Sequence, residues 1–225
     1  MARRSGQTPL TRERILATAL RLADASGLDA LSMRRLATEL GVDPMAIYHY
    51  LPSKDALLTG LVERVFAELR LPANPGGDWR ARVRDWARAY HDLTLAHPRF
   101  VLHLVADPQR AAPAALAANE PLYAALEQAG FAPRPLLLAA DSLVDYVNGC
   151  VLAVAAGALR DAGERQDLLA LLARHPADAY PTLRRVFGQL CDAELHGDFD
   201  FGLDALLAGL ASLPNVEVDA LPDLS

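Results

Sequence analysis

Apolar residues recur along this chain at the three- and four-residue spacing of amphipathic helices, without the alternation typical of half-buried strands. The pattern is tightest between Leu31 and Lys54. There Ser32 precedes an apolar stripe, and its hydroxyl can accept from free N–H groups at a helix start. Gly41 follows the stripe and suits a left-handed helix terminus. The stripe is formed by Met33, Leu36, Ala37 and Leu40. The pattern predicts a short helix followed by a tight turn.

A second short helix is predicted directly after this turn. Asp43 can cap it, and Pro44 occupies its first position, where a missing N–H is no loss. The helix has room for about two turns before Pro52. A helix, a glycine turn and a short capped helix in this order form the helix-turn-helix pattern. This motif places its second helix in the DNA major groove. The outward-facing residues are Arg34, Arg35, Met45, Ala46, Tyr48, His49 and Lys54.

Further helices are predicted on both sides of this motif. Thr11 can cap a first helix that ends near Ala25, and Ser53 can cap a fourth helix that runs to Leu69 and links the motif to the rest of the chain. Two prolines and two glycines within residues 71–77 then break any helix. We therefore expect a DNA-binding domain with its linking helix over residues 11–71. Residues 1–10 are expected to form a flexible arm, in which Arg3 and Arg4 either reach DNA or remain solvated.

A larger helical domain is expected over residues 78–213, followed by a loose tail over 214–225. Asp78 can cap a long helix that ends near His97, and Pro108 and Pro113 are expected to bracket a loop. The other predicted helices are Ala114–Ala129, Leu136–Arg160, one within 161–176, Ala179–Leu195 and Phe199–Leu213. The predicted fold class is all-α, with an N-terminal three-helix DNA-binding domain and a larger C-terminal helical domain.

Charge and composition agree with this division. The formal charge of −6 is unfavourable for a DNA-binding protein, but residues 1–71 carry net +2 and residues 72–225 carry net −8. DNA binding requires only one basic face. No apolar run reaches the roughly 18 residues that span a bilayer, and the N-terminus lacks the apolar core of a secretory signal. We therefore expect a cytoplasmic protein without membrane contact.

Motifs for catalysis, cofactors and metals are missing from the sequence. It contains no GxSxG, GxGxxG or GxxxxGK[ST] pattern. Cys150 and Cys191 fit no zinc spacing and are interpreted as reduced, buried thiols. His91, His97 and His103 recur every six residues, which places neighbours about 240° apart on a helix. They are interpreted as scattered structural histidines. We expect no enzyme activity, no cofactor and no metal.

Residues Thr11 to Phe66 resemble the N-terminal domain of TetR-family transcriptional regulators. The resemblance is carried by the segments GLDALSMRRLATELGV and IYHYLPSKDALL, which follow each other with continuous spacing. It implies that the DNA-binding residues are Ser32, Arg34, Pro44, Met45, Ala46, Tyr48, His49, Tyr50 and Lys54. Arg34 is suited to a guanine edge, and Met45 and Ala46 are suited to thymine methyl groups. Tyr48, His49 and Lys54 resemble phosphate anchors, whereas Tyr50 either contacts phosphate or packs in the small core.

Two later helices carry seams suited to helix pairing. In Leu136–Arg160, apolar residues alternate four and three apart, and Phe199–Leu213 carries a comparable stripe. A single chain can bury both seams internally. The resemblance instead implies a four-helix interface between two subunits, which suits a palindromic operator read by two recognition helices. The expected interface residues are Val144, Val147, Val151, Val154, Leu203, Leu206 and Leu210.

The resemblance also implies a small-molecule effector held between the C-terminal helices. The candidate effector-binding residues are Trp86, Tyr90, His103, Tyr123, Asp145 and Asn148. Core packing is an equal alternative for the two aromatic residues of the 78–97 helix. A wetted face or an internal hydrogen bond is the alternative for Asp145 and Asn148. His103 resembles the magnesium-binding histidine of tetracycline repressors, but Ala153 stands where their acidic residue is expected. An apolar effector without metal is therefore favoured over magnesium–tetracycline.

The sequence thus predicts a dimeric, ligand-responsive DNA-binding repressor that a largely apolar effector releases from its operator. The alternative is a helical small-molecule-binding protein, or an enzyme, in which the helix-turn-helix has only a structural role. The donors Arg34, Tyr48, His49 and Lys54 discriminate between the two, because a purely structural domain does not need them exposed.

Overall fold

The computed structural model describes residues 9–72, 77–98, 108–155, 164–189 and 199–213. Throughout these ranges the regular elements are helices, and no strand is present. The chain forms two compact units, Met1–Ala129 and Gly130–Ser225. The first unit therefore contains the predicted DNA-binding domain together with the two helices that follow it. The predicted all-α fold class is confirmed.

The N-terminal helices begin at the capping residues that the sequence indicates. The helices are α1 (Arg12–Ser26), α2 (Met33–Leu40), α3 (Pro44–Tyr48) and α4 (Lys54–Phe66), with a 3₁₀ turn at Leu28–Ala30. Thr11, Ser32, Asp43 and Ser53 each accept a backbone N–H from the first turn of the following helix. Gly41 ends α2 with φ 68°, in the left-handed region where glycine costs least. The four predicted caps and the glycine turn are confirmed.

A single apolar core holds these four helices together. Each helix contributes residues that are almost inaccessible to solvent, which are Ile15 and Leu16 from α1, Leu36 from α2, Ile47 from α3, and Leu57 and Leu61 from α4. Helix α1 packs against both α2 and α4, and α2 packs against α3. Gly60 lets α4 approach α1 closely, because a Cβ at this position would lie 2.9 Å from Leu16 Cδ2. The core fixes the small helix α3 through one buried side chain, Ile47.

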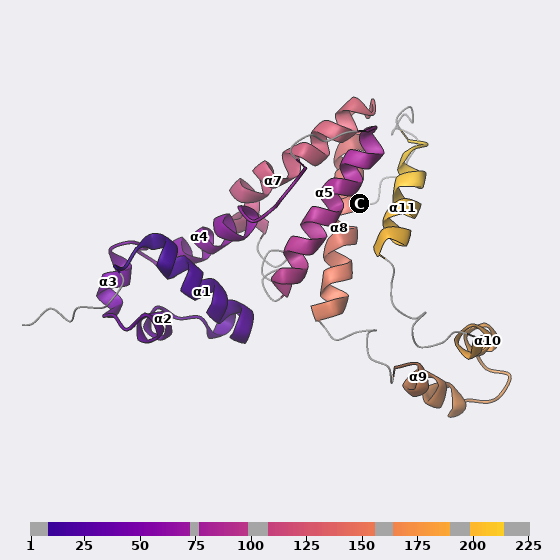
Figure 1. Cartoon of the computed structure of the whole chain (residues 1–225). Helices are drawn as coiled ribbons and strands as arrows, with labels where there is room; N and C mark the ends of the chain where they lie inside the picture. Colours follow the sequence, from indigo (N-terminus) through magenta and orange to yellow (C-terminus); the bar gives the residue numbers. More distant parts are fainter. Residues whose placement is uncertain (1–8, 73–76, 99–107, 156–163, 190–198, 214–225) are drawn as a thin grey trace, which may run out of the picture. The chain divides into compact units, whose positions relative to one another are not determined.

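Helices α5 (Trp79–Ala96) and α7 (Pro108–Gln128) complete the first unit. They pack against each other, and α7 also packs against α4 (Figure 1). Asp78 caps α5, and the Ala81 N–H that donates to its carboxylate holds the pKa of Asp78 below its usual range. The aromatic rings of Phe66, Tyr90 and Trp86 stack in series, so α4 and α5 share one aromatic cluster.

Two helix limits in this unit differ from the prediction. Helix α7 begins at Pro108 and includes Pro113, where a loop was expected, and it also contains Pro121. Proline removes one backbone hydrogen bond and disfavours a helix interior, but packing against α4 and α5 outweighs that local cost here. Helix α4 ends at Phe66 rather than Leu69, and Glu68 and Leu69 continue only as a turn.

The second unit contains α8 (Pro133–Ala155), α9 (Glu164–Ala173), α10 (Pro181–Gln189) and α11 (Phe199–Leu210). Helix α8 begins three residues before the predicted start, since Pro133 and Pro135 lie in its first turn, where no N–H is needed. Helices α8 and α11 pack together. The Tyr146 hydroxyl donates to the Phe199 carbonyl at 2.8 Å, and the two rings stack.

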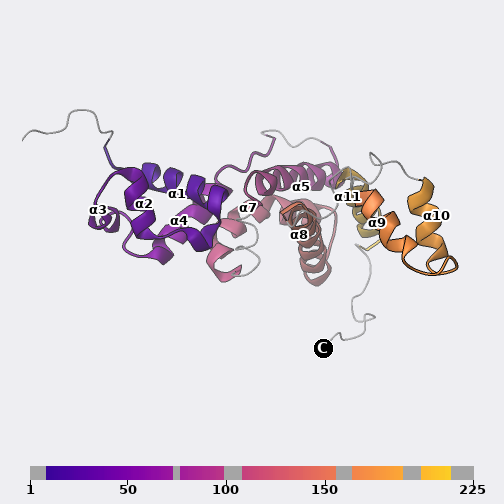
Figure 2. The same cartoon turned by 90° about the horizontal axis from the view of Figure 1, so that it is seen from below.

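Helices α9 and α10 form a hairpin, visible in Figures 1 and 2. Arg184 on α10 holds the hairpin, because its guanidinium donates to backbone carbonyls at the end of α9 and in the connecting turn. The acceptors with ordinary distances are Ala179, His175 and Pro176, at 2.8, 3.0 and 3.1 Å. A positively charged side chain at a helix C-terminus is favourable, because the last carbonyls lack partners within the helix.

Helix α8 is also the one segment of the described chain that has the length and hydropathy to cross a membrane, over Pro133–Val154. Its mean hydropathy of 1.5 alone does not distinguish a membrane span from the core helix of a globular protein. Asp141 and Asp145 lie near its middle, and its packing against α11 occupies part of its surface. Within the single chain, 28% of the most apolar window of this helix is buried.

Candidate nucleic-acid interface and effector site

Helix α3 presents a short surface held by one anchor. Ile47 is fully buried, whereas Met45 is 64% exposed and Tyr48 and His49 are also exposed. Pro44 and Ala46 are half-buried. Five residues cannot form a stable helix alone, so α3 depends on Ile47 and on the Asp43 cap. The exposed side chains contribute little to this packing and are available for a ligand outside the chain.

Four side chains around α2, α3 and the start of α4 have hydrogen-bonding capacity that the described residues leave unused. Arg34, Tyr48, His49 and Lys54 are exposed, and in the described part of the chain no hydrogen bond or ion pair holds their side-chain nitrogen or oxygen atoms. Arg35 differs from its neighbour, since its guanidinium donates to Ser26 Oγ at 2.9 Å. Arg34 is thus free for an external acceptor, whereas Arg35 is engaged within the domain.

Ser32 and Tyr50 have structural contacts of their own. The Ser32 hydroxyl accepts from Arg35 N at 3.2 Å and still retains a hydrogen to donate. Tyr50 is exposed, so it does not pack in the small core, and its hydroxyl donates to the Leu10 carbonyl at 2.8 Å. Tyr50 therefore holds Leu10, the last residue of the predicted arm, beside the end of α3. Contact of either residue with DNA remains a prediction.

An apolar cavity of about 280 Å³ lies in the first unit between α5, α7 and the segment after α4. Trp86 is the one predicted effector residue on its wall. Two charged side chains, Arg82 and Asp85, also face it, and the full lining is Leu71, Pro72, Arg82, Asp85, Trp86, Pro121, Ala124 and Ala125. Arg82 and Asp85 precede Trp86 by four and one residues on α5, and neither was predicted from the sequence as an effector contact.

Of the three predicted effector residues in the first unit that the structure describes, Trp86 lines this cavity and Tyr90 and Tyr123 do not. Tyr90 is buried against Trp86 and Phe66, as the core-packing alternative expects, and Tyr123 is half-buried on α7 outside this cavity. Asp145 is exposed and Asn148 half-buried on α8, within the second unit. His103 lies outside the described residues.

The predicted dimer residues divide into two groups. Val147, Val151, Leu203 and Leu210 are buried within the single chain, which agrees with the intrachain alternative for these four. Val144, Val154 and Leu206 are half-buried and keep surface for a partner. Large apolar side chains are also exposed beside them, most of all Phe201 on α11 at 75%. The homodimer remains a prediction.

Metal ligands are not clustered in the described part of the chain, where no group of three or more His, Cys, Asp or Glu side chains is arranged to hold an ion. Ala153, which stands where tetracycline repressors are expected to carry an acidic residue, is a half-buried methyl on α8.

The geometry defines a class of protein. Four helices present a capped helix-turn-helix with unengaged donors on its surface, and a longer helix joins it to a helical body with an apolar cavity. This is the construction of a helix-turn-helix DNA-binding regulator.

Comparison with known proteins identifies the particular family. Residues 15–61 match the family described as "Bacterial regulatory proteins, tetR family", and residues 71–213 match "Tetracyclin repressor-like, C-terminal domain". The chain belongs to the TetR family of transcriptional regulators. The resemblance of the sequence to this family is thus confirmed. The C-terminal match begins at residue 71, close to the predicted boundary, whereas the first compact unit extends to Ala129.

Individual relatives agree along nearly the whole chain. An HTH-type transcriptional regulator of Saccharopolyspora erythraea is 34% identical over 209 residues, which cover 92% of this chain and 87% of the relative. The HTH-type transcriptional repressor DrrR1 of Streptomyces coeruleorubidus is 32% identical, with 93% and 80% covered. The structure of ActR from Streptomyces coelicolor in complex with actinorhodin is similar with a TM-score of 0.74 and 29% identity, covering 93% of this chain and 100% of ActR.

Proposed function

We propose that this regulator is a cytoplasmic homodimeric repressor that binds a palindromic DNA operator and leaves it when a small, largely apolar effector binds. The observation that carries the proposal is the set of unengaged, exposed donors Arg34, Tyr48, His49 and Lys54 around α3. A purely structural domain gains nothing from exposing these groups, whereas DNA supplies acceptors for all of them. DrrR1 carries the name repressor, which supports the proposed direction of regulation.

The DNA-reading residues are proposed to divide by role. Arg34 donates to a guanine edge, and Met45 and Ala46 contact thymine methyl groups beside Pro44. Tyr48, His49 and Lys54 bind phosphate, as does the Ser32 hydroxyl at the start of α2. Tyr50 supports the interface through its bond to the Leu10 carbonyl. Direct reading of bases then depends mainly on Arg34, because the exposed start of α3 lacks hydrogen-bonding side chains.

The effector is proposed to bind in the cavity beside Trp86. Its lining is mostly apolar, and Arg82 and Asp85 supply the few polar contacts that orient a ligand. Trp86 stacks on Tyr90 and Tyr90 on Phe66, so a shift of Trp86 reaches the end of α4 through packed rings. Release requires that the effector bind the DNA-free geometry better than the DNA-bound one. ActR, solved with actinorhodin, is a relative with a ligand in its structure.

The first test is selection of binding sites from a random duplex DNA library, followed by affinity and salt titrations on the selected site. A palindromic site with a steep salt dependence supports a dimeric DNA-binding regulator. No enrichment at low salt would overturn the proposal and favour a small-molecule-binding protein with a structural helix-turn-helix. Compounds that raise the melting temperature are then tested for release of the selected DNA, and stabilising compounds that never release it would contradict the effector role.

Replacing Arg34 with alanine should weaken operator binding by about 1–3 kcal/mol and relax the preference at one base pair of each half-site, because a bidentate guanine contact is lost. Fluorescence anisotropy with the selected operator and single-base variants measures both effects. Arg35→Ala is the matched control, since the Arg35 guanidinium is already engaged by Ser26. Equal losses in both variants would contradict base reading by Arg34.

Replacing Lys54 with alanine should weaken all DNA sequences alike, because a phosphate contact carries no sequence information. The slope of log K against log salt should fall by about 1 in magnitude for each protomer's lost contact. Titrations between 50 and 300 mM salt, roughly the range over which counterion release dominates, measure the slope. An unchanged slope would remove Lys54 from the interface.

Replacing Phe201 with arginine should weaken the proposed homodimer by about 2 kcal/mol or more, roughly thirtyfold in Kd, because an exposed aromatic side chain on α11 would lose its apolar partner surface. Sedimentation equilibrium measures the change. Leu116→Arg on α7 is the control, since Leu116 is equally exposed but lies outside the predicted interface. Wild-type association by the Phe201 variant would place the interface elsewhere.

A further inference from the structure

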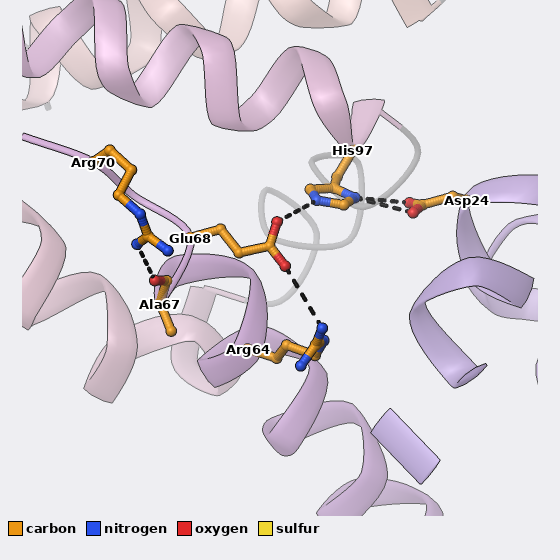
Figure 3. Close-up of polar contacts among 6 residues, drawn as sticks. All are labelled: Asp24, Arg64, Ala67, Glu68, Arg70 and His97. Atoms are coloured by element: carbon orange, nitrogen blue, oxygen red, sulfur yellow. Dashed lines mark hydrogen bonds and ion pairs between the residues drawn. The ribbon is translucent and has the colours of Figure 1, made fainter. Parts of the chain in front are cut away.

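His97 lies where three segments of the first unit meet (Figure 3). It caps the C-terminus of α5, and its side chain is only 10% exposed. Its Nδ1 lies 3.1 and 3.0 Å from Asp24 Oδ1 and Oδ2 on α1, and its Nε2 lies 3.4 Å from Glu68 Oε2 in the turn after α4. One buried ring therefore touches the DNA-binding domain, the end of the linking helix and the body.

Each of the two contacts is a hydrogen bond only if the ring nitrogen that makes it carries a hydrogen, Nδ1 for Asp24 and Nε2 for Glu68. Carboxylate oxygens only accept, and a neutral imidazole carries one N–H, so a neutral His97 can satisfy Asp24 or Glu68 but not both. The other nitrogen would then direct its lone pair at a carboxylate oxygen. Only the imidazolium donates in both directions. The observed arrangement of the three side chains is thus complete only when His97 carries a second proton.

The two carboxylates are not equivalent. Asp24 presents both oxygens to Nδ1, whereas Glu68 is farther away and is shared with Arg64, whose Nη2 lies 4.0 Å from Glu68 Oε1. A neutral His97 therefore keeps its hydrogen on Nδ1, toward Asp24. Glu68 then remains with Arg64 alone. The charged side chains in contact with the ring in the described part of the chain are thus Asp24 from α1 and Glu68 from the turn after α4.

We propose that His97 is a proton-dependent link between α5 and the end of α4, permanently anchored to α1 by Asp24. With the proton present, the link is closed and the end of α4 is tied to the body. Without it, the α4 end is released while α1 stays attached. Because α1 stays attached in both states, the link sets whether α5 holds the DNA-binding domain through α1 alone or through both α1 and the end of α4.

The direction of the pH dependence follows from the contacts. The second ring hydrogen has the Glu68 carboxylate as an acceptor in the closed link and lacks this acceptor in the open one, so adding that hydrogen favours the closed link. We therefore expect the link to close as the pH is lowered and to open as the pH is raised. Between about pH 6 and pH 8 the ordinary carboxylates remain ionised, so this window isolates the histidine.

Hydrogen exchange of the full-length protein tests the link without DNA. The amides of Glu68 and Leu69 bond to the Val65 and Phe66 carbonyls, so they report on the end of α4. Their protection factors, corrected for intrinsic rates, should fall about three- to tenfold from pH 6 to pH 8. In Glu68→Gln the amide can donate to a neutral ring, and the fall should be less than about twofold.

Glu39→Gln is the matched control, because Glu39 is a carboxylate paired with Arg21 on the same domain and should leave the fall unchanged. The proposal would be overturned if the protection factors of the wild-type protein did not fall with pH. It would also be overturned if those of Glu68→Gln fell as much as those of the wild type. Nitrogen NMR of the wild-type imidazole provides a measurement that needs no variant. At pH 8 His97 should carry its hydrogen on Nδ1, and hydrogen on Nε2 would also overturn the proposal.

Operator binding extends the test and rests on the proposed DNA-binding function. The Kd of wild-type protein for its selected operator should change about three- to tenfold between pH 6 and pH 8 beyond the change seen in Glu68→Gln. His49 is present in both proteins, so any contribution from it cancels in the comparison. Identical pH profiles would overturn the regulatory role. Failure to bind any DNA would instead count against the proposed function and leave the exchange result intact.

Discussion

Replacing Trp86 with alanine should lower the free energy of unfolding by about 3–5 kcal/mol, the largest loss expected from any single change in the first unit. The indole is 1% exposed, its Nε1 donates to the Ala118 carbonyl at 2.9 Å, and its ring stacks on Tyr90. Truncation removes these contacts at once and leaves a void between α5 and α7. Urea unfolding followed by circular dichroism measures the loss without relying on indole fluorescence.

Two matched variants separate packing from hydrogen bonding at this position. Trp86→Phe keeps an aromatic ring against Tyr90 but loses the bond to Ala118, and should cost about 1–2 kcal/mol. Trp79→Ala removes the half-buried tryptophan at the start of the same helix and should cost less than half as much as Trp86→Ala. A loss from Trp86→Ala no greater than that from Trp79→Ala would show that the α5–α7 contact does not depend on the indole.

Replacing Gly202 with alanine should destabilise the second unit by about 1–3 kcal/mol, although alanine is the better helix former. A Cβ at this position would lie 2.8 Å from Tyr146 Cζ and 2.9 Å from Cε2. The ring would have to move, which breaks its hydroxyl bond to the Phe199 carbonyl and its stacking on Phe199. The contact between α8 and α11 at Tyr146 would therefore be weakened.

Gly209 supplies the comparison on the same helix. A Cβ there meets no atom within 4 Å, so Gly209→Ala should gain about 0.5–1 kcal/mol from helix propensity alone. Both substitutions add one methyl group to α11, and the difference between their unfolding free energies isolates crowding by Tyr146. Equal stabilisation by the two substitutions would show that Tyr146 moves aside without a loss of stability. The contact of Gly202 with Tyr146 would then contribute nothing to the packing of α8 against α11.

The DNA-binding domain could be predicted almost residue by residue because its signals are local. Ser32, Asp43 and Ser53 cap helices within three residues of themselves, and Gly41 sets one dihedral angle. Short-range chemistry of this kind is readable in one sequence. Helix α7 was harder, because Pro113 is a local helix breaker whose cost is offset by contacts with segments far along the chain.

The remaining misses have the same physical origin. Arg82 and Asp85 line the cavity because of where α7 and the 71–72 segment pack against α5, and no periodicity within α5 reports that. His97 was interpreted as a structural histidine, which its burial and polar contacts agree with, but partners 73 and 29 residues away could not be identified from spacing. Charged residues that tertiary packing brings together cannot be identified from the spacing of residues along the sequence. Asp145 and Asn148 were grouped by helical face, but their exposure depends on neighbours that spacing alone does not reveal.

The single anchor of α3 has a consequence for how this regulator can change. Ile47 is buried, whereas Met45, Tyr48 and His49 face outward and carry almost none of the packing. In the proposed interface, substitutions at these outward positions would change a base contact at Met45 and phosphate contacts at Tyr48 and His49, while leaving the fold nearly unaffected. A gene duplicate can therefore acquire a new binding site in a few steps without passing through an unfolded intermediate. The residues proposed to contact DNA are different from the residue that stabilises α3. DNA-binding specificity can therefore change while the fold is kept.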